Sequence, residues 1–276
     1  MIWSIFSKTK EPEILINELD STDSEVSKTA YRQLIDHPND ECDNLLINTL
    51  YFPETSNEKK ITIINILGLR ATEKALPLFQ KILKSSNKDL IVAVCEALFN
   101  IGTPDCIDEL VKSLTTPDDE LKQTITSYIL KIPNNEAMGS LLRCVPKDKN
   151  SQLYFEIASI MEEMDLFVTL KKNFEQSDPM IKEFYFSSLI KFNRSDFIPL
   201  YLDYYPTASS KHKEMLIEVL SDYEINELVL YFTEYIKSHG TEGLISLIDI
   251  VIIPKSKDSL LQILKFVIII KIQNIR

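Results

Sequence analysis

Apolar residues recur along the chain at a nearly fixed spacing. Eight apolar positions, which we call the anchors, follow one another at a mean interval of 31 residues. The anchors are Leu34, Leu67, Leu98, Ile129, Met161, Leu189, Leu220 and Val251. An apolar residue also stands four positions before each anchor, one helical turn away on the same face. A period of this length predicts a helical repeat protein.

A second helix precedes the anchor helix in each repeat. Fifteen positions before the anchors, seven of the eight residues are apolar, and most prolines stand between the predicted helices. Each repeat is therefore predicted to be a helical hairpin. Pro77 and Pro199 each stand 21 residues before an anchor, which places both in the first turn of a leading helix. Gly68 and Gly102 are predicted at helix ends.

One stretch of the chain resembles a known family. Residues 67–114 read LGLRATEKALPLFQKILKSSNKDLIVAVCEALFNIGTPDCIDELVKSL. This segment resembles the bacterial HEAT-like repeats, including the phycobilisome-lyase type, in its pattern of IG, ALP, L, then D, A and AL. The resemblance extends over residues 64–132 and implies an α-solenoid whose second helices line a concave binding surface. The arginine usual near the start of the second helix is absent, which implies a weak polar ladder between repeats.

We therefore expect an all-α fold, an α-solenoid of about eight HEAT-like hairpins plus a terminal helix. A single domain is expected over 1–276. It comprises a short apolar N-terminal cap (1–10), the repeats (11–254) and a hydrophobic terminal helix (255–276). Segment 255–276 is apolar nearly all round a helix, so it is a helix packed on the last repeat, an association surface or a pairing strand. We predict concentration-dependent self-association through it.

Composition narrows the class of protein further. The chain has 30 Lys and Arg against 41 Asp and Glu, a net charge of -11, and 5 glycines. So few glycines argue against phosphate loops and doubly wound sheets. No apolar stretch has the roughly 18 residues of a membrane span, so we expect a cytoplasmic protein. The four cysteines form no CxxC pair, and neither a metal site nor a cofactor is predicted.

No motif of catalytic chemistry stands in the sequence. GxGxxG, GxxxxGK, HExxH and GxSxG are all absent, so no catalytic residues are assigned and we expect a protein that is not an enzyme. One enzymatic alternative stays open, because HEAT-like solenoids include alkylpurine DNA glycosylases that bind duplex DNA. That activity requires a basic groove, whereas this chain is acidic.

Two groups of residues are candidates for binding a partner. The first group, which we call the row, stands two positions before each anchor and is polar throughout: Arg32, Asn65, Glu96, Ser127, Ser159, Ser187, Glu218 and Asp249. The second group comes from an aromatic cluster at 184–205 and contains Phe184, Phe186, Tyr201 and Tyr204. Each group has an alternative: the row is a merely solvated face, and the rings fill the core around a short repeat of 28 residues.

These observations favour a non-catalytic protein-protein interaction scaffold. We expect a partner protein or peptide on the concave face of the solenoid. The net charge favours a basic partner, such as a toxin to be neutralised. Binding of nucleic acid is disfavoured, because a phosphate backbone requires clustered Lys and Arg.

Overall fold

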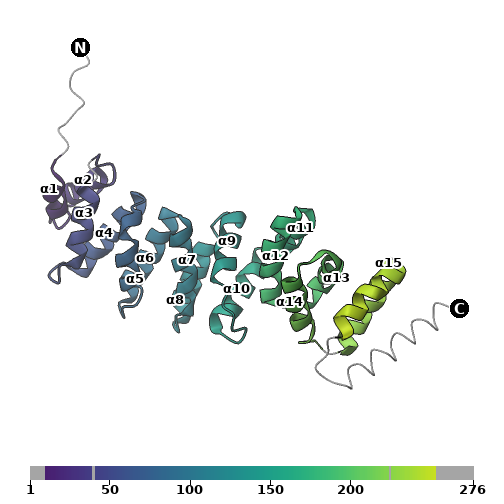
Figure 1. The fold of residues 1–276 in the computed structure, drawn as a ribbon. Helices are drawn as coiled ribbons and strands as arrows, with labels where there is room; N and C mark the ends of the chain where they lie inside the picture. The colour runs from purple at the N-terminus through teal and green to yellow at the C-terminus, as the bar shows by residue number, and fades with distance from the viewer. Residues whose placement is uncertain (1–9, 39–40, 224, 253–276) are drawn as a thin grey trace, which may run out of the picture. The chain divides into compact units, whose positions relative to one another are not determined.

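The computed structural model describes residues 10–38, 41–223 and 225–252. All regular elements of these residues are helices, so the predicted all-α repeat fold is confirmed (Figure 1). The chain divides into two compact units, Met1–Leu166 and Phe167–Arg276. The predicted cap at 1–10, except Lys10, and the terminal helix at 255–276 lie outside the described residues. The self-association through 255–276 and the single domain over 1–276 stay predictions.

The first unit consists of five helical hairpins. The leading helices are α1 (Pro12–Glu18), α3 (Glu41–Tyr51), α5 (Leu76–Ile82), α7 (Pro104–Lys112) and α9 (Asn134–Cys144). The second helices are α2 (Ser24–Ile35), α4 (Asn57–Leu69), α6 (Lys88–Ile101), α8 (Asp119–Ile129) and α10 (Gln152–Glu163). Helix α2 packs on α4, α4 on α6 and α6 on α8, while α7 packs on α9. Two layers of helices result, as predicted for stacked hairpins.

The second helices of this unit begin at a repeated capping position. Asp23, Ser56, Asn87, Asp118 and Ser151 each accept a hydrogen bond from a backbone N–H in the first turn of the helix that follows. Four of these caps stand 11 residues before their anchors and the fifth stands 10 before. Because each cap satisfies a donor that the helix leaves unpaired, this position fixes where the second helix starts.

Proline and glycine end and begin helices as the sequence predicts. Pro77 lies in the first turn of α5, directly after the short 3-10 helix η1 (Glu73–Ala75). Pro199 occupies the same place in α13 (Ile198–Tyr204), after η3 (Ser195–Phe197). Gly102 ends α6 in the left-handed conformation, with φ 68°. Both predictions for the prolines are confirmed.

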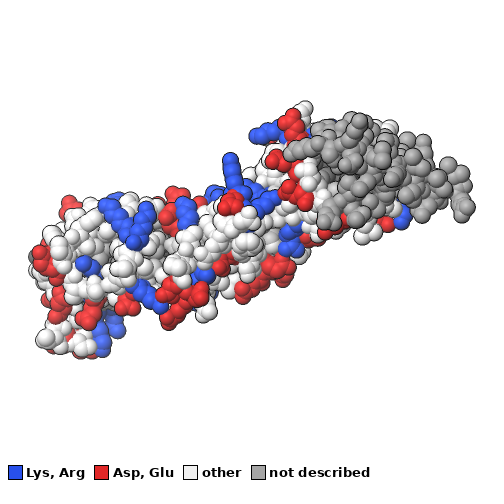
Figure 2. Space-filling view, turned by 90° about the horizontal axis from the view of Figure 1, so that it is seen from below, with Lys and Arg blue, Asp and Glu red and all other residues white. Residues whose placement is uncertain are grey.

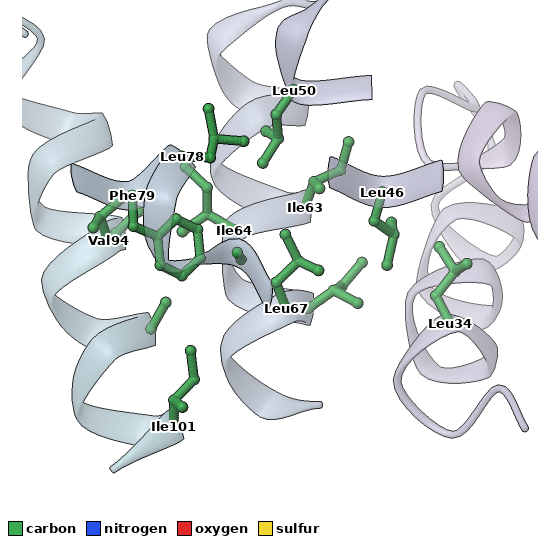
Figure 3. Packing of buried hydrophobic residues seen from close by; sticks show 14 of the residues in the cluster. Leu34, Leu46, Leu50, Ile63, Ile64, Leu67, Leu78, Phe79, Val94 and Ile101 are labelled. Atoms are coloured by element: carbon green, nitrogen blue, oxygen red, sulfur yellow. The ribbon is translucent and has the colours of Figure 1, made fainter. Parts of the chain in front are cut away.

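The anchors form the core of the repeats. All seven anchors whose side chains are described are buried, from Leu34 to Leu220. In the first unit, Leu34, Ile63, Leu67 and Val94 belong to one apolar cluster that runs between the two layers of helices (Figure 3). A single repeat cannot bury its apolar face alone. Burial of the anchors and of the apolar residues one turn before them is therefore the main source of stability in this fold.

Gly68 on α4 packs closely against Ala97 on α6. A Cβ atom at this position would lie 2.7 Å from the Cα and 2.9 Å from the Cβ of Ala97. We expect Gly68→Ala to lower the free energy of unfolding by about 1–2 kcal/mol, because overpacking outweighs the gain in helix propensity. Gly139→Ala in α9 is the matched control, since its Cβ would meet only the end of the Arg143 side chain at 3.4 Å. Urea denaturation followed by circular dichroism compares the two variants, and equal stabilities would contradict this role of Gly68.

Ion pairs link neighbouring second helices. The Lys88 Nζ atom lies 3.0 Å from Asp118 and 2.7 Å from Glu120, which joins α6 to α8. The Lys122 Nζ atom lies 3.1 Å from Glu156, which joins α8 to α10. Lys122 stands at the position where related repeats usually carry arginine. The resemblance implied a weak polar ladder, and in this part of the chain lysine makes the links instead.

The second unit contains the remaining helices. They are α11 (Leu166–Gln176), which begins at the boundary, α12 (Pro179–Phe192), α13, α14 (Ser210–Leu220) and α15 (Ile225–Ile252). The short 3-10 helix η4 (Tyr205–Thr207) follows α13. A non-helical backbone at Gly240, with φ 60° and ψ -134°, interrupts α15. The two halves of α15 stand where the sequence predicts the eighth pair of helices.

Candidate binding surface

The row lies on the surface of the first unit. A residue two positions before an anchor is rotated by about 200° around the helix axis, so it points away from the core. Arg32, Glu96, Ser127 and Ser159 are exposed, and Asn65 is half-buried. Because these helices are consecutive in one layer, we call this solvent-facing side of α2, α4, α6, α8 and α10 the second-helix face.

The row is only partly described in the second unit. Glu218 in α14 is exposed, whereas Ser187 in α12 is half-buried and donates a hydrogen bond to the Glu183 carbonyl oxygen at 3.0 Å. Asp249 belongs to α15, and its side chain lies outside the described residues. The exposure expected of the row therefore holds for five of its members, while their contact with a partner stays a prediction.

Three second helices carry an aromatic residue near the row: Tyr31 on α2, Phe99 on α6 and Tyr128 on α8. Tyr31 from α2 and Tyr128 from α8 are half-buried, and burial is the main reason that the pKa of each phenol is raised. The negative charge of the Glu96 carboxylate raises the pKa of both tyrosines further. Phe99 packs on Tyr128 with 5.6 Å between the ring centroids. The Nζ atom of Lys131 lies over the Tyr128 ring at 5.2 Å.

The carboxylate and the neighbouring amide have unused hydrogen-bonding capacity. No hydrogen bond or ion pair of the Glu96 side chain is found among the described residues. The Asn65 side chain stands at the same repeat position on α4, and its Oδ1 atom is buried without a hydrogen-bond partner. Buried polar atoms of this kind are uncommon and call for an explanation.

Three of the four aromatic candidates belong to the core of the second unit. Phe186 and Tyr201 are completely buried, and Tyr204 is 7% exposed. The Phe186 ring lies 5.9 Å from that of Tyr201 and 5.0 Å from that of Tyr204. The prediction that Phe186, Tyr201 and Tyr204 contact a partner is wrong, because their rings pack against one another. Phe184 is 61% exposed and stays a candidate.

Both signs of charge occur on the surface. Figure 2 shows Lys and Arg interspersed with Asp and Glu on the viewed face, with uncharged surface between them. On the second-helix face the row contributes one cation, Arg32, and one anion, Glu96. This arrangement differs from the clustered cations that bind a phosphate backbone.

Groups with reactive chemistry are sparse in the described part of the chain. Residues 10–38, 41–223 and 225–252 hold no group of three or more His, Cys, Asp or Glu that could bind a metal ion. Burial raises the pKa of the Cys95 thiol to about 12 and is the largest reason that the pKa of Cys144 is raised to about 11. Both thiols are therefore protonated, and poor nucleophiles, at neutral pH.

No helix in the described part of the chain has the length and apolar character needed to cross a bilayer.

The repeat pattern did not single out the aromatic residues of this face. Tyr31, Phe99 and Tyr128 occupy three different positions relative to their anchors, so no single row contains them. A signal for them exists nevertheless. Tyr31 and Tyr128 are each adjacent in sequence to a row residue, and Phe99 stands three residues, or about one helical turn, after Glu96.

Together, the fold and this surface define an all-helical repeat protein with an exposed polar face on its second helices. Residues 44–130 match the family model for HEAT repeats, which confirms the resemblance to HEAT-like repeats seen in the sequence. No curated protein matches the chain.

Two solved structures are similar to the chain at low identity. The first is the complex of CpcE and CpcF of phycocyanin lyase from Nostoc sp. PCC7120, with 13% identity over 93% of each chain and a TM-score of 0.36. The second is an engineered protein, with 18% identity over 66% of this chain and 96% of that chain, and a TM-score of 0.31. Both TM-scores lie below 0.5, so neither likeness bears on function.

Proposed function

We propose that the protein is a non-catalytic scaffold that binds a partner protein or peptide along the second-helix face. The observation that carries this proposal is the exposure of Arg32, Glu96, Ser127 and Ser159 on helices of one layer. Stacked helical repeats present such a layer as one extended surface, which is the usual binding surface of solenoid proteins. HEAT repeats typically mediate protein interactions, and the matched residues 44–130 include α4, α6 and α8 of this face.

The partner that we propose is basic. The net charge of -11 attracts a cationic protein, and Glu96 and Glu218 add exposed carboxylates to the row. Such a complex should weaken as the salt concentration rises, because added ions screen exposed charges. The exposed ring of Phe184 is proposed as a further contact in the second unit.

The test uses bulky substitutions that leave the core untouched. Tagged full-length protein, a variant with Ser127→Trp and Ser159→Trp, and a control with Asn135→Trp on the leading helix α9 are used to capture partners from extract of the source cells at about 150 mM salt. All three altered residues are exposed. A basic protein retained by the wild type and the control, and lost by the double variant, supports the proposal.

Two results would contradict it. Equal capture of the same protein by all three forms would place its binding site elsewhere. Recovery of duplex DNA without a stoichiometric protein would favour the glycosylase alternative. A salt titration of the captured complex tests the charge of the partner, since salt-insensitive binding would argue against a basic one.

A further inference from the structure

His239 is the histidine of this chain that solvent reaches. The chain has three histidines, and the other two, His37 and His212, are buried. The His239 side chain is 44% exposed and stands directly before the interruption of α15 at Gly240. Its ring stacks on that of Tyr235, one turn earlier on the same helix, with 4.3 Å between the centroids. Packing therefore holds an accessible imidazole in a defined orientation.

The hydrogen bonds of this ring define which nitrogen carries the proton. The His239 Nδ1 atom lies 3.1 Å from the carbonyl oxygen of Tyr235 and 2.8 Å from the Ser238 Oγ atom. A carbonyl oxygen can only accept, and the Ser238 hydroxyl itself donates to the carbonyl oxygens of Glu234 and Tyr235. The Nδ1 atom is therefore an N–H donor. In the neutral ring, the lone pair then belongs to Nε2.

A carboxylate lies close to this second nitrogen. The His239 Nε2 atom is 3.6 Å from the Oδ1 atom of Asp203 on α13, and the Asp203 side chain is 59% exposed. This separation is longer than a direct hydrogen bond of about 2.7–3.2 Å. A lone pair and a carboxylate repel one another unless a positive group lies between them. The two atoms therefore suit either a proton or a metal ion.

The separation of the two atoms fits a bridging metal ion. A tetrahedral Zn²⁺ ion lies about 2.0–2.1 Å from a histidine nitrogen and about 2.0–2.2 Å from a carboxylate oxygen, which places the two ligand atoms about 3.4 Å apart. The observed 3.6 Å is close to this value. A histidine that binds a metal also commonly donates its other N–H to a backbone carbonyl, as His239 does to Tyr235. A proton, in contrast, would give only an ion pair of two exposed side chains, which contributes little.

We propose that His239 and Asp203 form a binding site for a divalent transition-metal ion such as Zn²⁺. Imidazole and carboxylate are both ligands of this ion, and water completes its coordination. The described residues contain no group of three or more metal-binding side chains, so the site has two protein ligands. The bound ion links α13 to α15 within the second unit. This site goes beyond the proposed scaffold function, because neither ligand belongs to the row.

The test titrates Zn²⁺ into untagged full-length protein at neutral pH and measures the heat of binding. Excess Mg²⁺ is present throughout, because it competes for ordinary carboxylates but not for imidazole. We expect saturable binding and a higher melting temperature, since a ligand of the folded state stabilises that state. His239→Phe keeps a ring on Tyr235 but removes the ligand, and Asp203→Asn removes the charged one. Each should weaken binding by at least about tenfold.

Glu214→Gln is the matched control, because it removes an exposed carboxylate from the same unit and should leave Zn²⁺ binding unchanged. Circular dichroism checks that each variant is folded. Absence of saturable binding, or equal binding by wild type and His239→Phe, would overturn the site. If only His239→Phe weakens binding, a single histidine binds the ion and the link between α13 and α15 is wrong. If wild type is stabilised by acidification but not by Zn²⁺, a protonated ion pair replaces the proposed metal site.

Discussion

Arg70→Met is expected to lower the free energy of unfolding of the first unit by about 3 kcal/mol or more. The Arg70 side chain is only 9% exposed, and its Nε atom donates to Asp43 at 2.5 Å. One guanidinium nitrogen also donates to the carbonyl oxygens of Leu34, Ile35 and His37 at the end of α2, at 2.7, 3.1 and 3.0 Å. Methionine fills a similar volume but takes the guanidinium donors away from Asp43 and from these carbonyls, although the Leu34 carbonyl keeps the His37 N–H as another donor.

A second pair provides the control for this variant. Arg143 also pairs with an aspartate, Asp108, through two hydrogen bonds of 3.0 and 2.8 Å, but its side chain is 49% exposed. Arg143→Met should therefore cost about 1 kcal/mol or less. Urea denaturation followed by circular dichroism measures both changes. Equal losses would show that the Arg70–Asp43 pair contributes no more than an ordinary surface ion pair. Asp43→Leu in the Arg70→Met background should restore part of the stability, because it removes the unpaired carboxylate.

Properties that act within one repeat could be predicted from the sequence. The period, the anchors and the prolines Pro77 and Pro199 depend on helical periodicity and on the missing N–H of proline, and the structure confirms each of them. The exposure of the row follows from the same periodicity, because a residue about 200° from a buried anchor faces the solvent.

Properties that join two repeats could not be predicted in this way. Gly68 is the clearest example: the sequence predicted its place near the end of a helix, but not its close packing against Ala97 on α6. Arg70 donates a hydrogen bond to the carbonyl oxygen of Ile35 at the end of α2, although the two residues are 35 positions apart in the sequence. Nothing in the local sequence pattern indicates that contact. The Phe99 ring on α6 packs on the Tyr128 ring from α8. Such contacts depend on how the hairpins stack.

The aromatic run at 184–186 shows how a change in repeat length alters the register. In the other repeats whose side chains are described, the residue four positions before the anchor is buried. In the 28-residue repeat that ends at Leu189 this residue is Tyr185, which is half-buried, and Phe186 is buried in its place. Positions three and four before an anchor both lie one turn away, so either can face the core. The spacing therefore predicted that the three rings diverge, but not which one is exposed.

Because Phe186 occupies the buried position three residues before the anchor Leu189, Phe186→Ala is the second substitution for which we expect a large effect. The Phe186 ring contacts the rings of Tyr201, Tyr204 and His212, with centroids 5.9, 5.0 and 4.9 Å away. Removal of a buried phenylalanine ring loses its transfer free energy and leaves a cavity, so we expect the free energy of unfolding of the second unit to fall by about 3–5 kcal/mol. Urea denaturation followed by near-ultraviolet circular dichroism reports the loss of this aromatic packing.

Phe184→Ala is the matched control, because it is the same change two residues earlier on α12. The Phe184 ring is 61% exposed, so its removal should change the free energy of unfolding by no more than about 0.5 kcal/mol. If Phe184 is a contact residue, the stable Phe184→Ala protein should nevertheless retain less of the captured partner than the wild type does. Similar destabilisation by the two substitutions would contradict the assignment of Phe186 to the core and Phe184 to the surface. Because we expect Phe184→Ala, unlike Phe186→Ala, to leave the fold intact, this variant tests whether the exposed Phe184 ring contacts a partner.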